Sequence, residues 1–433
     1  MTAAVDSGGY RVAPAKLDAA AADLGGRAGA LETAQKAVAG VSVPATAFGQ
    51  VSASADCAAT LKKTLSELGE KIDGQVQRAK VLQNGLTASA AGYRRTDEQV
   101  AASYRSLLPE DPLPAVSGPV GAAASGTWAN AIAANRTKVS DALTAEQTRL
   151  QQLQSSGGSA DDIASSQRRI ALYQDILANN RQILRFDPAA DGRIAELVGS
   201  IQPGTRNVGL FVPGVNTRLD NFQGYADLGR SLVAADPTGR TAMVVWADGD
   251  FPQNPLVEGP DASYAQAMAP DLKTFGDELR GQVDTQTGGA ATITAIGHSY
   301  GGATVGLADS QGLAVDRVLH VESAGMGHGV WNPADLPASQ AGVQRFSMTA
   351  PLDPIVLAQG NAWGAEWTGI GHGADPDTFP GVTDLTTGND AAGNELWGLS
   401  SHSDVLKPGS DSWTNIYGVL TGGALTTVPG VQR

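Results

Sequence analysis

The sequence predicts an α/β domain with a mostly parallel β-sheet flanked by helices, preceded by an all-α region. From about residue 190, short apolar runs typical of strands alternate with helical segments, which is typical of a parallel sheet covered on both faces. Before residue 190, apolar residues recur every three or four positions, which is typical of amphipathic helices. With 433 residues, the chain exceeds the size at which one core stops growing, so we expect more than one folding unit.

Residues 1–108 are predicted to form a helical hairpin. Apolar residues keep helical spacing over residues 17–38 and again over residues 61–104. Pro44 and Gly49 lie between these two runs and supply the break between the arms.

Residues 109–189 are predicted to hold a second pair of helices, separated by SSGGS, which we interpret as a polar helical linker. Residues 190–433 then form the α/β domain. Its predicted strands are RNVGLFVPG, TAMVVWAD, ATITAIGHS, DRVLHVESAG, VQRFSMTAP and GVTDLTTG.

The charge of the chain disfavours nucleic acid as a partner. The net charge is −14, and residues 201–433 carry ten Lys and Arg against 24 Asp and Glu. Such a field repels phosphate backbones and anionic membrane surfaces and favours uncharged substrates. We expect no membrane-spanning segment and no general secretory signal peptide. Cys57, the single cysteine, excludes internal disulfides and is interpreted as structural.

Ser299 is the candidate nucleophile. It stands in the sequence GHSYG, which matches the pattern G-x-S-x-G. The apolar run ATITAI precedes it and the helix-like run GGATVGLAD follows it, and this strand-turn-helix setting is what a nucleophile elbow requires. A serine that merely caps a helix in a glycine-rich turn is the alternative.

The partners of a serine nucleophile in this fold class follow it along the chain, first an acid and then a histidine. Asp353 fits the acid, because it directly follows the predicted strand VQRFSM. His402 and His372 are the candidate bases, and we favour His402 because it follows the last predicted strand. For the oxyanion, we expect one donor in the amide of Tyr300. The second donor is the amide of Val215 or of Asn216, and the sequence leaves that choice open.

Residues from about 120 to 422 resemble an actinobacterial family of largely uncharacterised α/β-hydrolases. The motifs that carry the resemblance are LRFDPAADGRIAELVG, VGLFVPGVNT, VVWADGDFP, IGHSYGGATVGLA, HGADPD and SHSDVLKPGSDSWTNI. The resemblance implies an α/β-hydrolase fold and a serine hydrolase with Ser299 as nucleophile, Asp353 as acid and His402 as base. The DGD sequence in VVWADGDFP departs from the aromatic residue of many relatives, which bears on substrate choice.

Residues 1–108 resemble the small WXG/EspC-like helical hairpins exported by type VII secretion, with Phe48-Gly49 at the turn. The export signal of that group is a Tyr followed four residues later by Asp or Glu, and Tyr93 and Asp97 fit it. The resemblance implies secretion or a place in the cell envelope by a type VII route, whereas without export the protein stays cytoplasmic. The alternative is that these two residues are simply surface neighbours one helical turn apart.

These observations predict a serine ester hydrolase, carboxylesterase or lipase-like, acting through an acyl-enzyme without metal or organic cofactor. Its expected partners are a small-molecule or lipid ester and, through the hairpin, the type VII machinery or a helical protein. The alternatives are a catalytically silent binding protein on a hydrolase fold, or an amidase or thioesterase. Trp363, Trp367 and Trp397 are predicted either as core residues or as a lid or acyl-chain wall.

Overall fold

The computed structural model of the chain separates into two compact units, residues 1–5 with 11–111, and residues 6–10 with 112–433. Tyr93, Asp97 and Cys57 lie outside the described residues. The structure describes residues 14–42, 58–66, 126–255, 258–351, 353, 371–398 and 401–429, with single positions between 68 and 87.

The first unit contains two helical arms that contact each other. Helix α1 spans Pro14–Ala39, and residues 58–66 are also helical. Lys80 forms an ion pair with Glu32 of α1 at 2.5 Å, and Val76 and Ala28 are buried. Helices are therefore present in this N-terminal region, while the hairpin as a whole and its role in export stay predictions.

The second unit is built on an eight-stranded sheet with the order β1-β2-β4-β3-β5-β6-β7-β8. The pairs β1–β2 and β2–β4 are antiparallel, and all other neighbouring strands are parallel. The strands are β1 Gln182–Asp187, β2 Arg193–Val198, β3 Asn207–Val212, β4 Thr241–Ala247, β5 Thr292–His298, β6 Arg317–Val321, β7 Gln344–Met348 and β8 Val382–Leu385. This mostly parallel sheet confirms the predicted α/β fold class.

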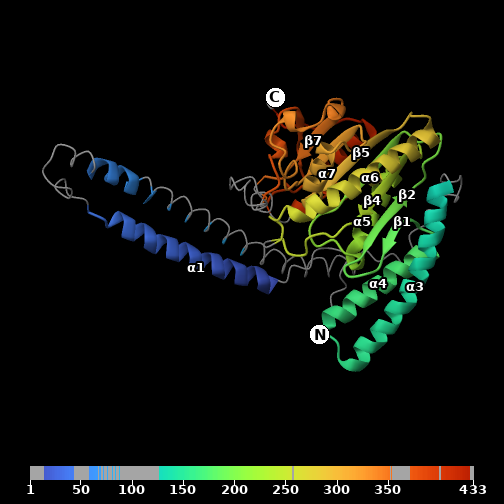
Figure 1. Cartoon of the computed structure of the whole chain (residues 1–433), viewed down its shortest axis with the longest axis horizontal. Coiled ribbons are helices and arrows are strands. Elements are labelled where there is room, and N and C mark those ends of the chain that lie inside the picture. The colour runs from blue at the N-terminus through green and yellow to red at the C-terminus, as the bar shows by residue number, and fades with distance from the viewer. Residues whose placement is uncertain are drawn as a thin grey trace. The chain divides into compact units, whose positions relative to one another are not determined.

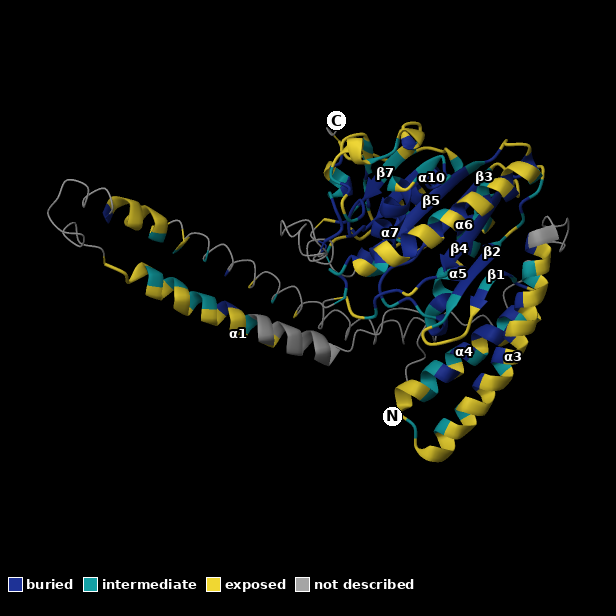
Figure 2. Ribbon diagram, in the orientation of Figure 1, coloured by how far each residue is buried: buried dark blue, intermediate teal, exposed yellow. Residues whose placement is uncertain are grey.

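Helices cover both faces of this sheet. Every residue of β4 is buried, as are six of the seven residues of β5, so side chains pointing to either face are covered. Figure 2 shows the buried strands in dark blue and the exposed sides of the outer helices in yellow. The continuous apolar runs that predicted these strands are therefore explained by burial on both sides.

The covering helices form two pairs. Helix α6 (Ser263–Thr287) packs against α7 (Tyr300–Ser310), and Figure 1 shows α6 running across the sheet. Helix α5 (Phe222–Ala234) lies beside α10 (Asp411–Thr421), and the indole of Trp413 in α10 donates a hydrogen bond to Ser231 in α5. The short helical elements are η1 Leu219–Asn221, η2 Pro333–Asp335, η3 Ala338–Gln340, η5 Pro376–Thr378 and α9 Ser401–Asp404.

The second helical pair belongs to the sheet-containing unit, which corrects the predicted boundary at residue 190. Helices α3 (Gly126–Ser156) and α4 (Ala160–Ala178) pack on each other, and α3 packs on β1, which itself lies before residue 190. The apolar residues of this pair were too few to indicate a core, yet Trp128 and Tyr173 are buried in the same cluster as the sheet. No helix in the described part of the chain is long and apolar enough to cross a membrane.

Candidate active site

Ser299 occupies a sharp turn between a strand and a helix. Strand β5 ends at His298 and α7 begins at Tyr300, and Ser299 between them has φ 57° and ψ −124°. A non-glycine residue in this conformation is strained, and such strain is concentrated at functional sites. The glycine at position 301 is required, because a Cβ there would lie 2.2 Å from the carbonyl oxygen of Val212. The local geometry is that of the predicted nucleophile elbow.

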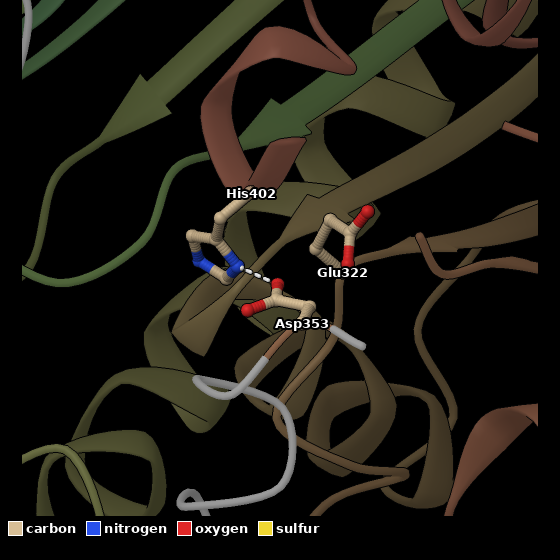
Figure 3. A group of neighbouring side chains, drawn as sticks. All are labelled: Glu322, Asp353 and His402. Carbon is tan, nitrogen blue, oxygen red and sulfur yellow. Dashed lines mark hydrogen bonds and ion pairs between the residues drawn. The ribbon is translucent and has the colours of Figure 1, made fainter. Parts of the chain in front are cut away.

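His402 joins Ser299 to Asp353. Its Nδ1–H donates to Oδ2 of Asp353 at 2.5 Å, and its Nε2 accepts from the hydroxyl of Ser299 at 2.8 Å. The acceptor-only carboxylate defines this tautomer. All three side chains are buried, and Figure 3 shows His402 and Asp353 facing each other with their hydrogen bond dashed. Asp353 follows β7 and His402 belongs to α9, so three separate elements bring these residues together.

His372, the other candidate base, lies elsewhere. Its Nε2–H donates to the carbonyl of Gly259 at 2.7 Å, and its ring packs edge-on against Tyr300. Burial lowers the pKa of His372 to about 4, so the imidazole is neutral in the folded protein. The hydrogen bonds therefore give His402, and not His372, the position of a base next to Ser299.

The two predicted alternatives for the second oxyanion donor differ in their backbone hydrogen bonds. The amide of Asn216 donates to the carbonyl of Pro252 at 2.7 Å, so this amide is already used and the Asn216 alternative is wrong. The amide of Val215 has no acceptor among the described residues. Gly214 brings this loop against the nucleophile, since a Cβ there would lie 2.7 Å from Cβ of Ser299. The amide of Tyr300, at the start of α7, is one of the donors a helix leaves without an internal partner.

Two further residues next to the triad were not among the predicted site residues. His298 is buried, and its Nε2–H donates to the backbone carbonyl of His402 at 2.6 Å. Burial lowers the pKa of His298 to about 3, which keeps this ring neutral and available as a donor. Its place directly before Ser299 in the sequence GHSYG is the only indication of it that the sequence offers.

Glu322 is the second such residue. It follows β6 directly, is fully buried, and accepts a hydrogen bond from the amide of Ala350 at 2.7 Å. Burial, and then the neighbouring Asp353 carboxylate, raise the pKa of Glu322 well above its usual range. The signal that could have revealed it is an acidic residue at the carboxyl end of an apolar strand.

Glu322, Asp353 and His402 offer ligand-type atoms within 4.8 Å of one another (Figure 3). A metal ion needs the Nδ1 lone pair of the imidazole, but this nitrogen carries the proton that it donates to Asp353. Glu322, Asp353 and His402 are therefore better explained as hydrogen-bonding acids and a base than as the ligands of a metal ion.

Trp397 is 61% exposed, which excludes its prediction as a core residue. The amide of its neighbour Gly398 donates to the carbonyl of Pro351, so this exposed indole belongs to the same loop cluster as Asp353. Trp363 and Trp367 lie outside the described residues.

The mostly parallel eight-stranded sheet and the strand-turn-helix at Ser299 together define an α/β-hydrolase fold. Residues 187–359 match the family model described as Alpha/beta hydrolase, a span that contains Ser299 and Asp353 but ends before His402. Two uncharacterised proteins of Mycobacterium tuberculosis, Rv2079 and MT2140, are each 28% identical over 138 residues. This match covers 28% of the chain, and the chain spans about a fifth of the length of these curated relatives.

Solved structures of hydrolases are also similar to this chain, at low identity. A 2,6-dihydroxy-pseudo-oxynicotine hydrolase is 11% identical, with a TM-score of 0.34 over 68% of this chain and 91% of its own. A dienelactone hydrolase-like promiscuous phosphotriesterase from metagenomic libraries is 12% identical, with a TM-score of 0.32 over 56% of this chain and 97% of its own. A carboxyl esterase from Bacillus coagulans is 12% identical, with a TM-score of 0.22 over 34% of this chain and 44% of its own.

Proposed function

We propose that the protein is a serine hydrolase that cleaves carboxylic ester bonds. The observation that carries the proposal is the unbroken hydrogen-bond chain from Ser299 through His402 to Asp353 at a strained elbow. The distance of 2.8 Å between Oγ of Ser299 and Nε2 of His402 is that of a normal hydrogen bond, so the proton of the serine hydroxyl faces its acceptor directly.

The geometry supports an acyl-enzyme mechanism. Oγ of Ser299 attacks the acyl carbonyl while Nε2 of His402 takes the hydroxyl proton, and the imidazolium formed is stabilised by Asp353. The amides of Tyr300 and Val215 stabilise the oxyanion of the tetrahedral intermediate. His402 then returns the proton to the leaving alcohol, and a water activated by the same imidazole releases the acid and the free serine.

The charge of the catalytic unit supports an uncharged small-molecule or lipid ester as substrate. Residues 201–433 carry 14 more acidic than basic side chains, a field that disfavours anionic substrates. Trp397 adds an exposed apolar surface in the loop cluster that holds Asp353, which suits contact with an acyl chain.

The proposal is tested by active-site labelling with a fluorophosphonate and by hydrolysis of p-nitrophenyl esters of increasing chain length. Wild type and the control Ser310→Ala, which changes the serine at the end of α7, are expected to be labelled and to hydrolyse the esters. Ser299→Ala is expected to lose both properties while keeping its circular dichroism spectrum. Labelling that persists in Ser299→Ala, or an inactive and unlabelled wild type, would contradict the proposal.

The N-terminal unit is proposed to serve export by a type VII route to the envelope or the medium. The paired arms held by Lys80 and Glu32 support a hairpin, and Tyr93 and Asp97 supply the sequence of the signal.

A further inference from the structure

The triad does not use Glu322, although this acid lies directly beside it. Strands β6 and β7 are parallel neighbours in which Val321 pairs with Met348, so their carboxyl ends meet at one edge of the sheet. Glu322 follows β6, and its amide donates to the carbonyl of Met348 at 2.9 Å. Asp353 follows β7 at the same edge, and Figure 3 shows the two carboxyl groups next to each other.

The surroundings of Glu322 require its carboxyl group to be neutral. Its Oε1 accepts from the amide of Ala350, whereas Oε2 is buried and receives no hydrogen bond from an N–H or O–H donor of the described residues. The group that faces Glu322 is the carboxylate of Asp353, and two buried carboxylates in contact do not both ionise. Asp353 accepts from the imidazole of His402, so it holds the charge and Glu322 holds the proton.

We propose that Glu322 is a positioning residue for the hydrolase: its neutral carboxyl group donates a hydrogen bond to Asp353 and fixes the carboxylate toward His402. This inference rests on the proposed esterase function. The backbone of Glu322 supports it, because φ is 46° and an ordinary acidic residue is held there in the left-handed region.

The other charged groups around Glu322 also favour its neutral form. Besides Asp353, the group that acts on Glu322 is Asp377 of η5, a half-buried acid whose own pKa is raised to about 6 by desolvation. The negative charges of Asp353 and Asp377 each disfavour ionisation of Glu322. His402 is the one titratable base of this array, and it bonds Asp353 and not Glu322.

The experiment compares Glu322→Gln with Glu322→Met in the full-length protein. Glutamine keeps a neutral donor for Asp353 and an acceptor for the amide of Ala350, whereas methionine has a similar volume and provides neither. We expect kcat for p-nitrophenyl esters to fall about threefold in Glu322→Gln and tenfold to hundredfold, roughly, in Glu322→Met, with KM unchanged in both. Glu278→Gln removes an exposed acid of α6 and serves as the control for loss of one carboxyl group.

The dependence of kcat/KM on pH separates positioning from a general structural effect. Because the replaced group carries no charge, the midpoint of the acid limb in Glu322→Gln should coincide with that of wild type. A shift of this midpoint by about one pH unit to lower pH would show that Glu322 is ionised and would overturn the inference. Equal losses of kcat in the two variants, or no loss in folded Glu322→Met, would overturn it as well. The melting temperature of each variant shows that it is folded, and continued labelling of Ser299 shows that the proposed function survives even where this inference fails.

Discussion

His372 and His402 are both buried imidazoles downstream of Ser299, and exchanging each for glutamine separates a catalytic base from a structural histidine. His402 accepts the hydroxyl hydrogen of Ser299, so His402→Gln removes the proton acceptor. We expect kcat to fall by about 10⁴-fold or more, as in other triads that lose their base. His372→Gln keeps a donor for the carbonyl of Gly259 and should retain most of its turnover.

The same two variants predict different pH dependences of stability. The pKa of His372 is about 4 in the folded protein, against 6.5 for an unperturbed imidazole. Between these values the unfolded chain binds a proton at His372 that the folded chain does not bind. The contribution of His372 to the free energy of unfolding is therefore fully present above pH 6.5 and is lost as the pH falls toward 4. About 2.5 pH units at about 1.36 kcal/mol each correspond to about 3 kcal/mol. His372→Gln should lack this part of the acid destabilisation.

Tryptophan fluorescence during urea unfolding is the suitable assay, because all seven tryptophans lie at or beyond residue 128 and report only on the second unit. The difference in unfolding free energy between pH 7 and pH 4 is measured for wild type and for His372→Gln, and contributions from all other groups cancel in the comparison. Identical pH dependences would refute the buried neutral state of His372. Loss of turnover in His372→Gln with turnover kept in His402→Gln would refute the assignment of the base.

Three further predictions follow from the same geometry. Asp353→Asn should lower kcat for p-nitrophenyl esters by about 10⁴-fold at most, because the base is misoriented but still present. A loss larger than that of His402→Gln would contradict this order. Gly301→Ala should abolish ester hydrolysis and lower the melting temperature, because the new Cβ would lie 2.2 Å from the carbonyl of Val212; a variant with wild-type melting and turnover would show that the elbow can relax. Tyr93→Ala or Asp97→Ala should retain the protein in the cytosol of a host with a type VII apparatus while the purified variants keep full esterase activity, and unchanged fractionation of both would count against the export signal.

The sequence was sufficient to predict the parallel part of the sheet and the position of the elbow, because both depend on local patterns. Strands β3, β4 and β5 are runs of mostly apolar or small residues, and Ser299 stands between a strand and a helix start in the sequence itself. The two antiparallel strands β1 and β2 were not predicted, since QILRFD and RIAELV are short and carry charges. Arg185 and Arg193 in these strands pair with acids of neighbouring segments, which only the tertiary structure provides.

The finer features of the site depend on contacts between distant residues, which no single segment encodes. The amide of Asn216 could be excluded as an oxyanion donor only once its acceptor, the carbonyl of Pro252, was known. Glu322 and Asp353 are 31 positions apart in the sequence, and the pairing of β6 with β7 brings them together. The choice of His402 over His372 was made from chain order, and the hydrogen bonds of the two rings now supply its physical basis.

The backbone conformation of Ser299 limits which nucleophiles this site could acquire in evolution. At φ 57° and ψ −124°, a side chain branched at Cβ meets its own backbone, so threonine is disfavoured while unbranched residues fit. Cysteine has the same shape as serine with a larger, more acidic sulfur atom, and aspartate places a carboxylate at the same point. Replacing this serine by cysteine can therefore exchange a hydroxyl for a thiol without rebuilding the turn, whereas the secondary alcohol of threonine would require a different backbone.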